Sequence, residues 1–325
     1  MSVLVTGGAG YIGSHTVLAL VERGESVVVL DNLSTGLRGH VADGAVFVQG
    51  EVADRALLSD LIDRHAIDSV IHFAGSIVVP QSVSDPLSYY ENNLVASHAL
   101  IAASVAGGVR AFIFSSTATV YAEDARQPLS EDAPKAPISP YARSKLMTEW
   151  ILEDVSRASD LRHIVLRYFN VCGADPAGRT GQISRTPTHL IKRAAMTALG
   201  RLPHLDIFGT DYPTPDGTGV RDYIHVTDLA AAHLLALDSL RSGANSTSYN
   251  CGYGHGLSVR QVVDAVESVI GRPLPVEVGP RRPGDPPVLI ADPSRIKAAL
   301  GWRPRHDDIG EIVRSVLAWE RKFNA

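Results

Sequence analysis

Tyr141 and Lys145 are the residues of this chain whose types and spacing most directly predict chemistry. Residues four apart lie on the same face of a helix, one turn from each other. A free tyrosine has a pKa of about 10, and a neighbouring ammonium favours the phenolate, so we expect a lowered pKa for Tyr141. A phenolate there could take a proton from a hydroxyl while a hydride leaves the same carbon. The pair therefore predicts redox chemistry on a secondary alcohol.

Hydroxyl-bearing residues precede this pair, in the run Phe-Ser-Ser-Thr-Ala-Thr-Val-Tyr over residues 114–121. The run follows a predicted strand over residues 111–114, so its hydroxyls are expected just past the strand end. Thr117 is placed to bond a substrate hydroxyl and to help order the proton transfer. For Ser115 and Ser116, a direct role and a simple turn at the strand end fit the sequence equally well.

A glycine-rich turn near the start of the chain predicts a nucleotide site. Gly7, Gly10 and Gly13 follow an apolar run and open a helical pattern. The first would permit a tight turn, the second would let the backbone approach a pyrophosphate, and the third would allow close packing of helix on strand. Asp31 ends the next apolar run, 18 residues after Gly13. Its carboxylate would accept the ribose hydroxyls of NAD and repel the phosphate of NADP, so the expected cofactor is NAD.

The elements that must position these residues alternate along the first half of the chain. Apolar runs that fit buried strands alternate with helical patterns, which is typical of a doubly wound parallel α/β (Rossmann) fold. The predicted strands cover residues 2–5, 27–30, 46–48, 69–73, 111–114 and 164–167. One predicted helix follows the glycine-rich turn and ends near residue 24, and three others cover residues 55–65, 92–106 and 140–156. Ser139 followed by proline predicts the N-cap of the last helix.

The second half of the chain has a different rhythm. Pro and Gly clusters separate the helical patterns, which cover residues 189–199, 228–237, 259–270 and 309–323. We predict a smaller C-terminal α/β lobe over the carboxyl ends of the first sheet, where ligands of such sheets bind. The expected division is an NAD-binding domain over residues 1–171, rejoined by about residues 222–247, and a substrate-binding lobe over residues 172–325.

The composition argues against several classes of protein. The chain has 325 residues and a net charge of −5, so a polycationic surface for DNA or RNA is not expected. No apolar run reaches the length of about 18 residues that a membrane span needs, and the first strand starts too early for a signal peptide. Cys172 and Cys251 are too few for a disulfide framework. We expect a cytoplasmic protein without a metal site.

Six motifs of the first half are shared with one family. They are Gly7-x-x-Gly10-x-x-Gly13, Asp31-Asn32-Leu33, His72-Phe73-Ala74-Gly75, Tyr89-Tyr90-Glu91-Asn92-Asn93, Ser116-Thr117-Ala118-Thr119-Val120-Tyr121 and Tyr141-x-x-x-Lys145. Together they resemble the extended short-chain dehydrogenase/reductase family. The stretches over residues 166–170, 207–226 and 281–285 narrow the resemblance to its NAD-dependent epimerases that act on UDP-sugars.

The resemblance, which spans nearly the whole chain, implies the ligand contacts. The implied cofactor-binding residues are Gly7, Gly10, Tyr11, Ile12, Gly13, Asp31, Asn32, Glu51, Val52, Phe73, Ala74, Gly75, Asn93, Ser115, Tyr141, Lys145 and Tyr168. The implied substrate-binding residues are Thr117, Tyr141, Asn170, His189, Leu190, Leu205, Phe208, Arg221, Tyr223, Arg282 and Asp285. The residue types suit a UDP-sugar, since two guanidiniums match a diphosphate. For Arg221, an ion pair with a neighbouring acid is the alternative.

Four positions depart from the better-known pattern of the family. Glu51 stands where an aspartate usually meets the adenine, and Ile77 stands where a lysine often reaches the pyrophosphate. His189 replaces an asparagine expected near the diphosphate. Leu289 has intermediate bulk at a position that affects whether an N-acetyl group fits. Retention of NAD and breadth of substrate are therefore the properties in which this chain could differ from its family.

The resemblance implies interconversion of UDP-galactose and UDP-glucose through a 4-keto sugar, with Thr117, Tyr141 and Lys145 as catalytic residues. UDP-N-acetylhexosamines and UDP-pentoses remain alternative substrates. A 4,6-dehydratase is less favoured because Ala118 and Thr119 follow Thr117 where an acid pair is typical, and a non-catalytic NAD-binding sensor is less favoured because the catalytic set is intact. The family also implies a homodimer. The apolar faces of the helices over residues 92–106 and 140–156 fit pairing across a two-fold axis and burial within the domain equally well.

Overall fold

The computed structural model describes residues 2–184, 187–282 and 285–323 of the chain. Its centre is a parallel sheet with the strand order β11-β6-β5-β4-β1-β2-β3. These strands are β1 (Ser2–Thr6), β2 (Ser26–Asp31), β3 (Val46–Gln49), β4 (Ile67–His72), β5 (Ala111–Thr117), β6 (Arg162–Tyr168) and β11 (Thr247–Cys251). The predicted doubly wound parallel sheet is confirmed, and β11 is a further strand that the sequence analysis missed.

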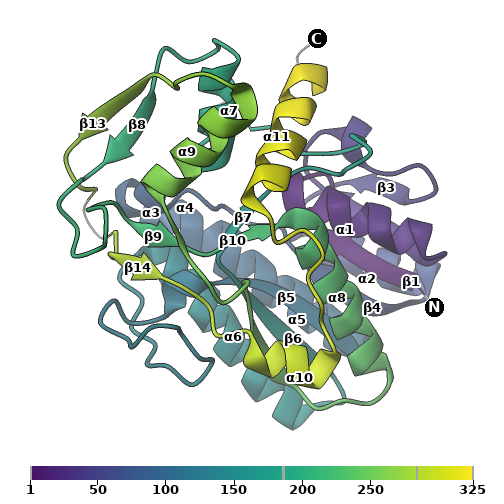
Figure 1. Ribbon diagram of the computed structural model, residues 1–325. Helices are drawn as coiled ribbons and strands as arrows, with labels where there is room; N and C mark the ends of the chain where they lie inside the picture. The colour runs from purple at the N-terminus through teal and green to yellow at the C-terminus, as the bar shows by residue number, and fades with distance from the viewer. Residues whose placement is uncertain (1, 185–186, 283–284, 324–325) are drawn as a thin grey trace.

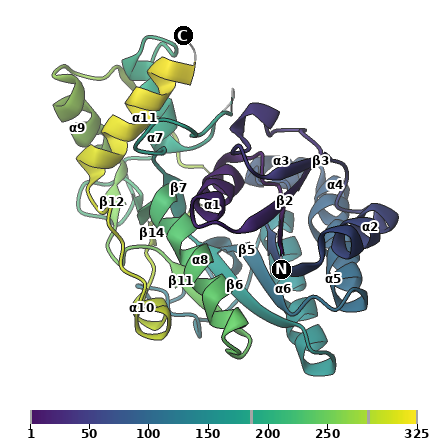
Figure 2. The same ribbon diagram turned by 90° about the vertical axis from the view of Figure 1, so that its right-hand side faces the viewer.

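Helices cover both faces of this sheet (Figure 2). The helices of one face are α1 (Tyr11–Glu22) and α8 (Val226–Arg241), and those of the other are α2 (Arg55–His65), α5 (Ala96–Ala106) and α6 (Pro140–Ala158). Strand residues alternate between the two layers: Val3 and Val5 belong to the core beneath α1, whereas Leu4 belongs to the core beneath α2. Because both sides of the strands are buried in apolar layers, the strands read as continuous apolar runs.

Short helical segments connect β2 to β3 and β4 to α5. They are η1 (Arg38–His40), α3 (Val79–Ser84), α4 (Pro86–Tyr90) and η2 (Glu91–Val95), and a further turn, η3 (Ala118–Val120), follows β5. The segment η2 is a π-helix, so the helix predicted over residues 92–106 starts with a wider turn. One such turn does not break an apolar pattern, and the sequence therefore did not reveal it.

The second lobe packs beside the carboxyl ends of the large sheet (Figure 1). Its helices are α7 (Leu190–Ala198), α9 (Val259–Ile270) and α11 (Ile309–Phe323), whereas α10 (Ser294–Leu300) packs against α8 and β11. Its small sheets pair β7 (Asn170–Cys172) with β10 (Tyr223–His225), β8 (Leu205–Phe208) with β13 (Val276–Gly279), and β9 (Val220–Arg221) with β12 (Leu257–Ser258) and β14 (Val288–Leu289). The predicted smaller α/β lobe is confirmed.

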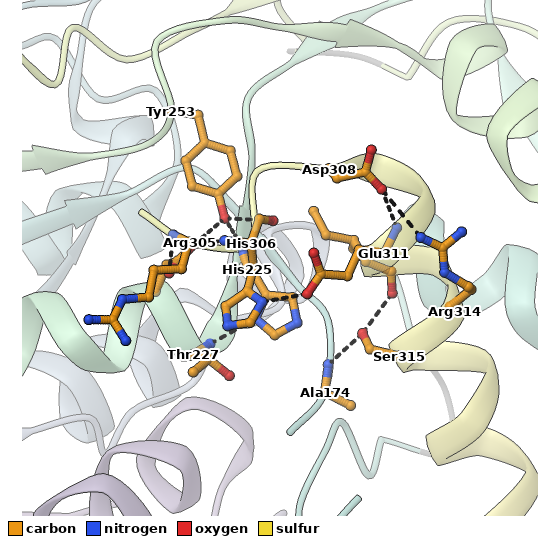
Figure 3. A network of polar contacts seen from close by, with 12 residues as sticks. Ala174, His225, Thr227, Tyr253, Arg305, His306, Asp308, Glu311, Arg314 and Ser315 are labelled. Atoms are coloured by element: carbon orange, nitrogen blue, oxygen red, sulfur yellow. Dashed lines mark hydrogen bonds and ion pairs between the residues drawn. The ribbon is translucent and has the colours of Figure 1, made fainter. Parts of the chain in front are cut away.

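A buried polar network fastens the C-terminal segment to the start of α8 (Figure 3). The Asp228 carboxylate accepts hydrogen bonds from the Tyr253 hydroxyl at 2.7 Å and from the His306 backbone N–H at 2.9 Å. The ring of His306 lies 4.6 Å from that of His225, and its Nδ1 lies 2.6 Å from a Glu311 carboxylate oxygen. These contacts fix the entry of α11 and hence the position of the second lobe.

Candidate active site

The glycine turn between β1 and α1 is closed as tightly as its sequence predicts. Gly7 has φ +71°, and a Cβ placed there would lie 2.6 Å from the backbone nitrogen of Ala74. A Cβ at Gly13 would lie 2.2 Å from the Gly7 carbonyl oxygen, so helix and turn could not pack with a larger residue. Gly10 is the N-cap of α1 and supplies no side chain to cap it. The first amides of α1 can therefore face an anion, together with the positive end of the helix dipole.

The acidic residue at the end of β2 reaches across this turn. Asp31 accepts hydrogen bonds from the backbone N–H groups of Ala9 at 2.9 Å and Leu33 at 2.8 Å, through different oxygens. Each carboxylate oxygen has about two acceptor positions, so capacity for ribose hydroxyls remains. Asn32 donates to both oxygens of Glu51, at 3.2 and 3.1 Å. The glycine turn and Asp31 together fit the nucleotide half of NAD.

Other residues expected at the cofactor lie around the ends of β1, β4 and β6. Tyr11 donates to the Gly173 carbonyl at 2.6 Å and so joins the turn to the second lobe. Phe73 packs 4.8 Å from the ring of His233, and the same histidine pairs with the Tyr168 hydroxyl at 2.7 Å. Ile12 and Ala74 are partly buried, whereas Val52 is buried in the core beneath α2.

Asn93 and Gly75 bring the cofactor side of the site against the catalytic helix. Asn93, in the π-helical turn, accepts from the Ser76 N–H at 2.7 Å and donates to the Ser144 hydroxyl at 3.2 Å. A Cβ at Gly75 would lie 3.6 Å from Lys145 Nζ and 2.9 Å from Asn93 Oδ1. The contact that is too close for a side chain is the one with Asn93, so Gly75 makes room for the Asn93 amide beside Lys145.

The catalytic helix α6 begins as predicted. The Ser139 hydroxyl accepts from the Ala142 N–H at 3.2 Å and caps the helix, with Pro140 in its first turn. Lys145 donates to the carbonyl of Ser115 at 3.0 Å, which fixes α6 against the end of β5. The hydroxyl of Thr117 interacts with the phenol of Tyr141. The structure thus brings Thr117, Tyr141 and Lys145 together.

Two expectations about this cluster need correction. Ser115 to Thr117 are the last residues of β5 itself rather than residues beyond its end, because the strand continues its pairing with β6 through Thr117. The chain's own groups also do not lower the pKa of Tyr141. Burial raises that pKa to about 12, against the smaller opposing effect of the Thr117 hydroxyl. Burial lowers the pKa of Lys145 to about 8, and the nearby charge of Glu149 opposes this change.

On the second lobe, the charged residues expected at the substrate form one cluster. Arg282 pairs with Asp285 at 2.7 Å, and its guanidinium lies 4.9 Å from the centre of the Phe208 ring. Arg221 also faces Asp285, at 3.7 Å, so the ion pair considered as its alternative does form. Phe208 is 38% exposed. Pro283 and Gly284 of this motif lie outside the described residues.

The remaining substrate candidates lie on neighbouring short strands, at the start of α7 and in the core. Asn170 pairs with Tyr223 between β7 and β10, and Leu289 pairs with Arg221 between β14 and β9. Leu190 is partly buried at the start of α7, next to His189, whose Nδ1 lies 2.8 Å from the Gln182 amide nitrogen. Leu205 is fully buried in the core, so its side chain does not face this cluster.

One buried residue of the site was missed from the sequence. Glu149 is one turn beyond Lys145 on α6, and its carboxylate binds Ser116 and Arg167. Its spacing of four from Lys145 and eight from Tyr141 is the signal that could have identified it.

Comparisons with known proteins agree with this geometry. Residues 3–252 match the model of the NAD dependent epimerase/dehydratase family. The UDP-glucose 4-epimerase of Azospirillum brasilense is 54% identical over 99% of this chain and 92% of its own length. The UDP-glucose-4-epimerase of Stenotrophomonas maltophila, crystallised with NAD and formylated UDP-arabinopyranose, superimposes with a TM-score of 0.96 at 41% identity, covering 100% of this chain and 99% of that one. The UDP-glucose 4-epimerase of Bifidobacterium longum, in complex with NAD+ and UDP, superimposes with a TM-score of 0.93 at 39% identity. The match covers 99% of this chain and 98% of that one.

Proposed function

We propose, from the premise that this chain belongs to the NAD dependent epimerase/dehydratase family, that it is an isomerase that interconverts UDP-galactose and UDP-glucose. The observation that carries the proposal is the meeting of Thr117, Tyr141 and Lys145 at the end of β5, beside a turn that fits NAD. Relatives that match almost end to end carry the name of this activity.

When bound, NAD would supply the hydride acceptor and donor for C4 of the sugar. The glycine turn would hold its pyrophosphate, and Asp31 would hold a ribose. Tyr141 takes the proton of the 4-hydroxyl and later gives it back, and Thr117 orders that transfer through its contact with the phenol. Because burial raises the pKa of Tyr141 to about 12, the ammonium form of Lys145 is needed to favour the phenolate.

The substrate must be held unequally, since its 4-keto sugar has to turn over between the two hydride transfers. Arg221 and Arg282 would bind the diphosphate, and Phe208 would cover the uracil. These anchors belong to the second lobe, whereas the residues that handle protons belong to the first. The nucleotide can therefore stay fixed while the hexose rotates.

The test is Tyr141→Phe, assayed for conversion of UDP-galactose to UDP-glucose. Loss of a general acid/base group is expected to lower kcat on the order of 10²–10⁴-fold. Tyr249→Phe, which removes the hydroxyl of a buried tyrosine in β11, is the control and should leave kcat unchanged. Activity of Tyr141→Phe within a few-fold of the wild type would exclude Tyr141 as the base.

Two alternative activities are separated by the products. With UDP-galactose and no added NAD, turnover supports an epimerase that retains its cofactor. Release of a free 4-keto-6-deoxy sugar would identify a dehydratase. The absence of any reaction would favour a non-catalytic NAD-binding sensor. A panel with UDP-N-acetylgalactosamine and UDP-pentoses tests substrate breadth. Leu289 is the relevant residue because of its intermediate bulk, and it lies beside Arg221 in the strand register.

We further propose a homodimer that forms through α5 and α6. Val105 on α5 is 38% exposed, and contact with a second copy would remove this apolar surface from water. Sedimentation of the wild type should give a dimer, and Val105→Asp should weaken it. A wild-type monomer at micromolar concentration would overturn the proposal.

We also propose a cytoplasmic location and the division of the chain stated above. Both cysteines are free and buried, which fits a reducing compartment. Within the described ranges, no helix combines the length and apolarity that a membrane crossing requires. The return of the chain to the large sheet through α8 and β11 supports a first domain that is rejoined by residues of about 222–247.

A further inference from the structure

We propose that Glu149 is a positioning residue for the Tyr141–Lys145 pair, an inference that rests on the proposed function. The three residues follow each other at intervals of four on α6, so they share one stripe of the helix. Tyr141 and Lys145 supply the proton chemistry. Glu149 is the next residue of this stripe and is buried, with 6% of its surface exposed.

The carboxylate of Glu149 joins the catalytic helix to the catalytic strand. One oxygen accepts from the Ser116 hydroxyl at 2.5 Å, and the other accepts from Arg167 Nη2 at 2.6 Å. Ser116 stands between Ser115, whose carbonyl binds Lys145, and Thr117, which contacts Tyr141. Since successive strand residues point to opposite faces, Ser116 faces α6, whereas Ser115 points to the other face of the sheet, where its hydroxyl bonds Tyr168. The carboxylate therefore sets where α6 stands relative to Thr117.

Arg167 is itself held in place from the other side. Its Nη1 donates to the Tyr121 hydroxyl at 2.9 Å and to the Glu131 carbonyl at 3.2 Å, and the residue is 3% exposed. A buried ion pair can often be replaced by apolar residues without loss of stability. Stability alone therefore does not account for this pair beside Lys145, whereas the need for a fixed negative charge there does.

The charge of Glu149 also acts on Lys145 directly. Burial lowers the pKa of Lys145 to about 8, and Glu149 counteracts this effect. The other described titratable groups around the pair are His72 of β4, Tyr89 of α4 and Tyr168 of β6. Burial lowers the pKa of His72 to about 3 and raises those of both tyrosines, so all three are neutral near pH 7. Glu149 thus helps to keep the ammonium that Tyr141 requires.

A cavity of about 470 Å³ gives access to this carboxylate from outside the active site. Glu149, Arg167 and Trp150 are among its lining residues, and Tyr141 and Lys145 are not. A small carboxylate such as formate or acetate can therefore reach the position of a deleted Glu149 side chain without competing with substrate.

The activity test compares Glu149→Ala with the wild type. We expect kcat for UDP-galactose to fall about 10–100-fold through misplacement of the pair, with KM nearly unchanged because the nucleotide anchors lie elsewhere. Formate or acetate should restore kcat in a saturable manner. Glu153→Ala is the matched control, since Glu153 lines the same cavity but pairs with Arg157 at the surface, and it should be unaffected.

A second measurement does not depend on activity. The chain has only five lysines, so the titration of Lys145 can be followed by NMR of lysine labelled with 13C at Cε, assigned with Lys145→Arg. Glu149→Gln keeps an acceptor for Ser116 but removes the charge. It should lower the pKa of Lys145 and move the alkaline limit of kcat to lower pH. Glu149→Gln also tests the proposal if Glu149→Ala fails to fold.

The outcomes separate this inference from the proposed function. An inactive wild type would overturn the epimerase activity, while the lysine titration would still report on Glu149. An active wild type with unchanged kcat in Glu149→Gln would overturn the positioning role alone. A loss of kcat with neither rescue by carboxylates nor a shift in the Lys145 titration would also overturn it, since it would reflect damage to packing only.

Discussion

Acid should destabilise the folded protein through its buried histidines, and His233 offers the clearest case. His233 is fully buried. Its Nδ1 lies 2.8 Å from the carbonyl oxygen of Leu229, and its Nε2 lies 2.7 Å from the hydroxyl of Tyr168. A carbonyl can only accept, so Nδ1 carries the proton and Nε2 accepts from the tyrosine. The neutral ring satisfies both partners, and burial lowers the pKa of His233 from 6.5 to about 4.

The sign and size of the effect follow from this pKa. The unfolded chain binds the proton more readily than the folded one, so stability is complete above pH 6.5 and falls as the pH drops towards 4. For these two pKa values, linkage gives a loss of about 2 kcal/mol between pH 7.5 and pH 5 from this one residue. The loss is large against a typical total stability of about 5–15 kcal/mol.

Urea unfolding of the wild type and of His233→Gln at pH 7.5 and pH 5 measures this loss of stability on acidification. The variant is less stable at pH 7.5 if packing suffers, but its loss on acidification should be smaller than that of the wild type by about 2 kcal/mol. His65→Gln, at the partly exposed end of α2, serves as the control. Equal losses on acidification in the wild type and His233→Gln would refute the reasoning.

Three further changes test the site. Gly13→Ala would place a Cβ 2.2 Å from the Gly7 carbonyl oxygen, so the purified variant should contain little NAD when the denatured protein is assayed for cofactor, unlike Gly39→Ala, whose Cβ meets nothing within 4 Å. Arg282→Ala should weaken UDP binding in calorimetry at least about tenfold, the value of one charge-assisted hydrogen bond; unchanged affinity would remove this residue from the diphosphate site. Ser139→Ala should lower the free energy of unfolding by about 1 kcal/mol in urea titrations, through loss of the cap of α6.

Most of the large sheet could be predicted because its strands are buried on both faces. The helices over residues 55–65 and 259–270 were predicted to their ends, and both have side-chain caps at their N-termini. By contrast, β11 has the sequence Thr-Ser-Tyr-Asn-Cys, which lacks an apolar run, and strands of two or three residues in the second lobe are too short to show a pattern.

The sequence predicted the site residues whose chemistry follows from their type and spacing. It predicted less well the properties that depend on the folded environment, such as burial and pKa. Tyr141, Lys145 and Thr117 were identified from sequence, and the structure brings them together. The chain's own groups do not lower the pKa of Tyr141, because burial outweighs them, and the sequence did not reveal this burial. Glu149 was missed because a carboxylate on a helix usually faces solvent, and only its contact with Arg167 shows otherwise.

The placement of β11 has a consequence for synthesis of the protein. Its partner β6 ends at Tyr168, about eighty residues before β11 begins, so the edge of β6 has no neighbour while the intervening chain leaves the ribosome. An unpaired edge strand is a template for aggregation, and closing so long a loop is slow. Nascent chains that stall or are cut between these strands should accumulate as insoluble material and depend on chaperones, even though the nucleotide turn is already complete.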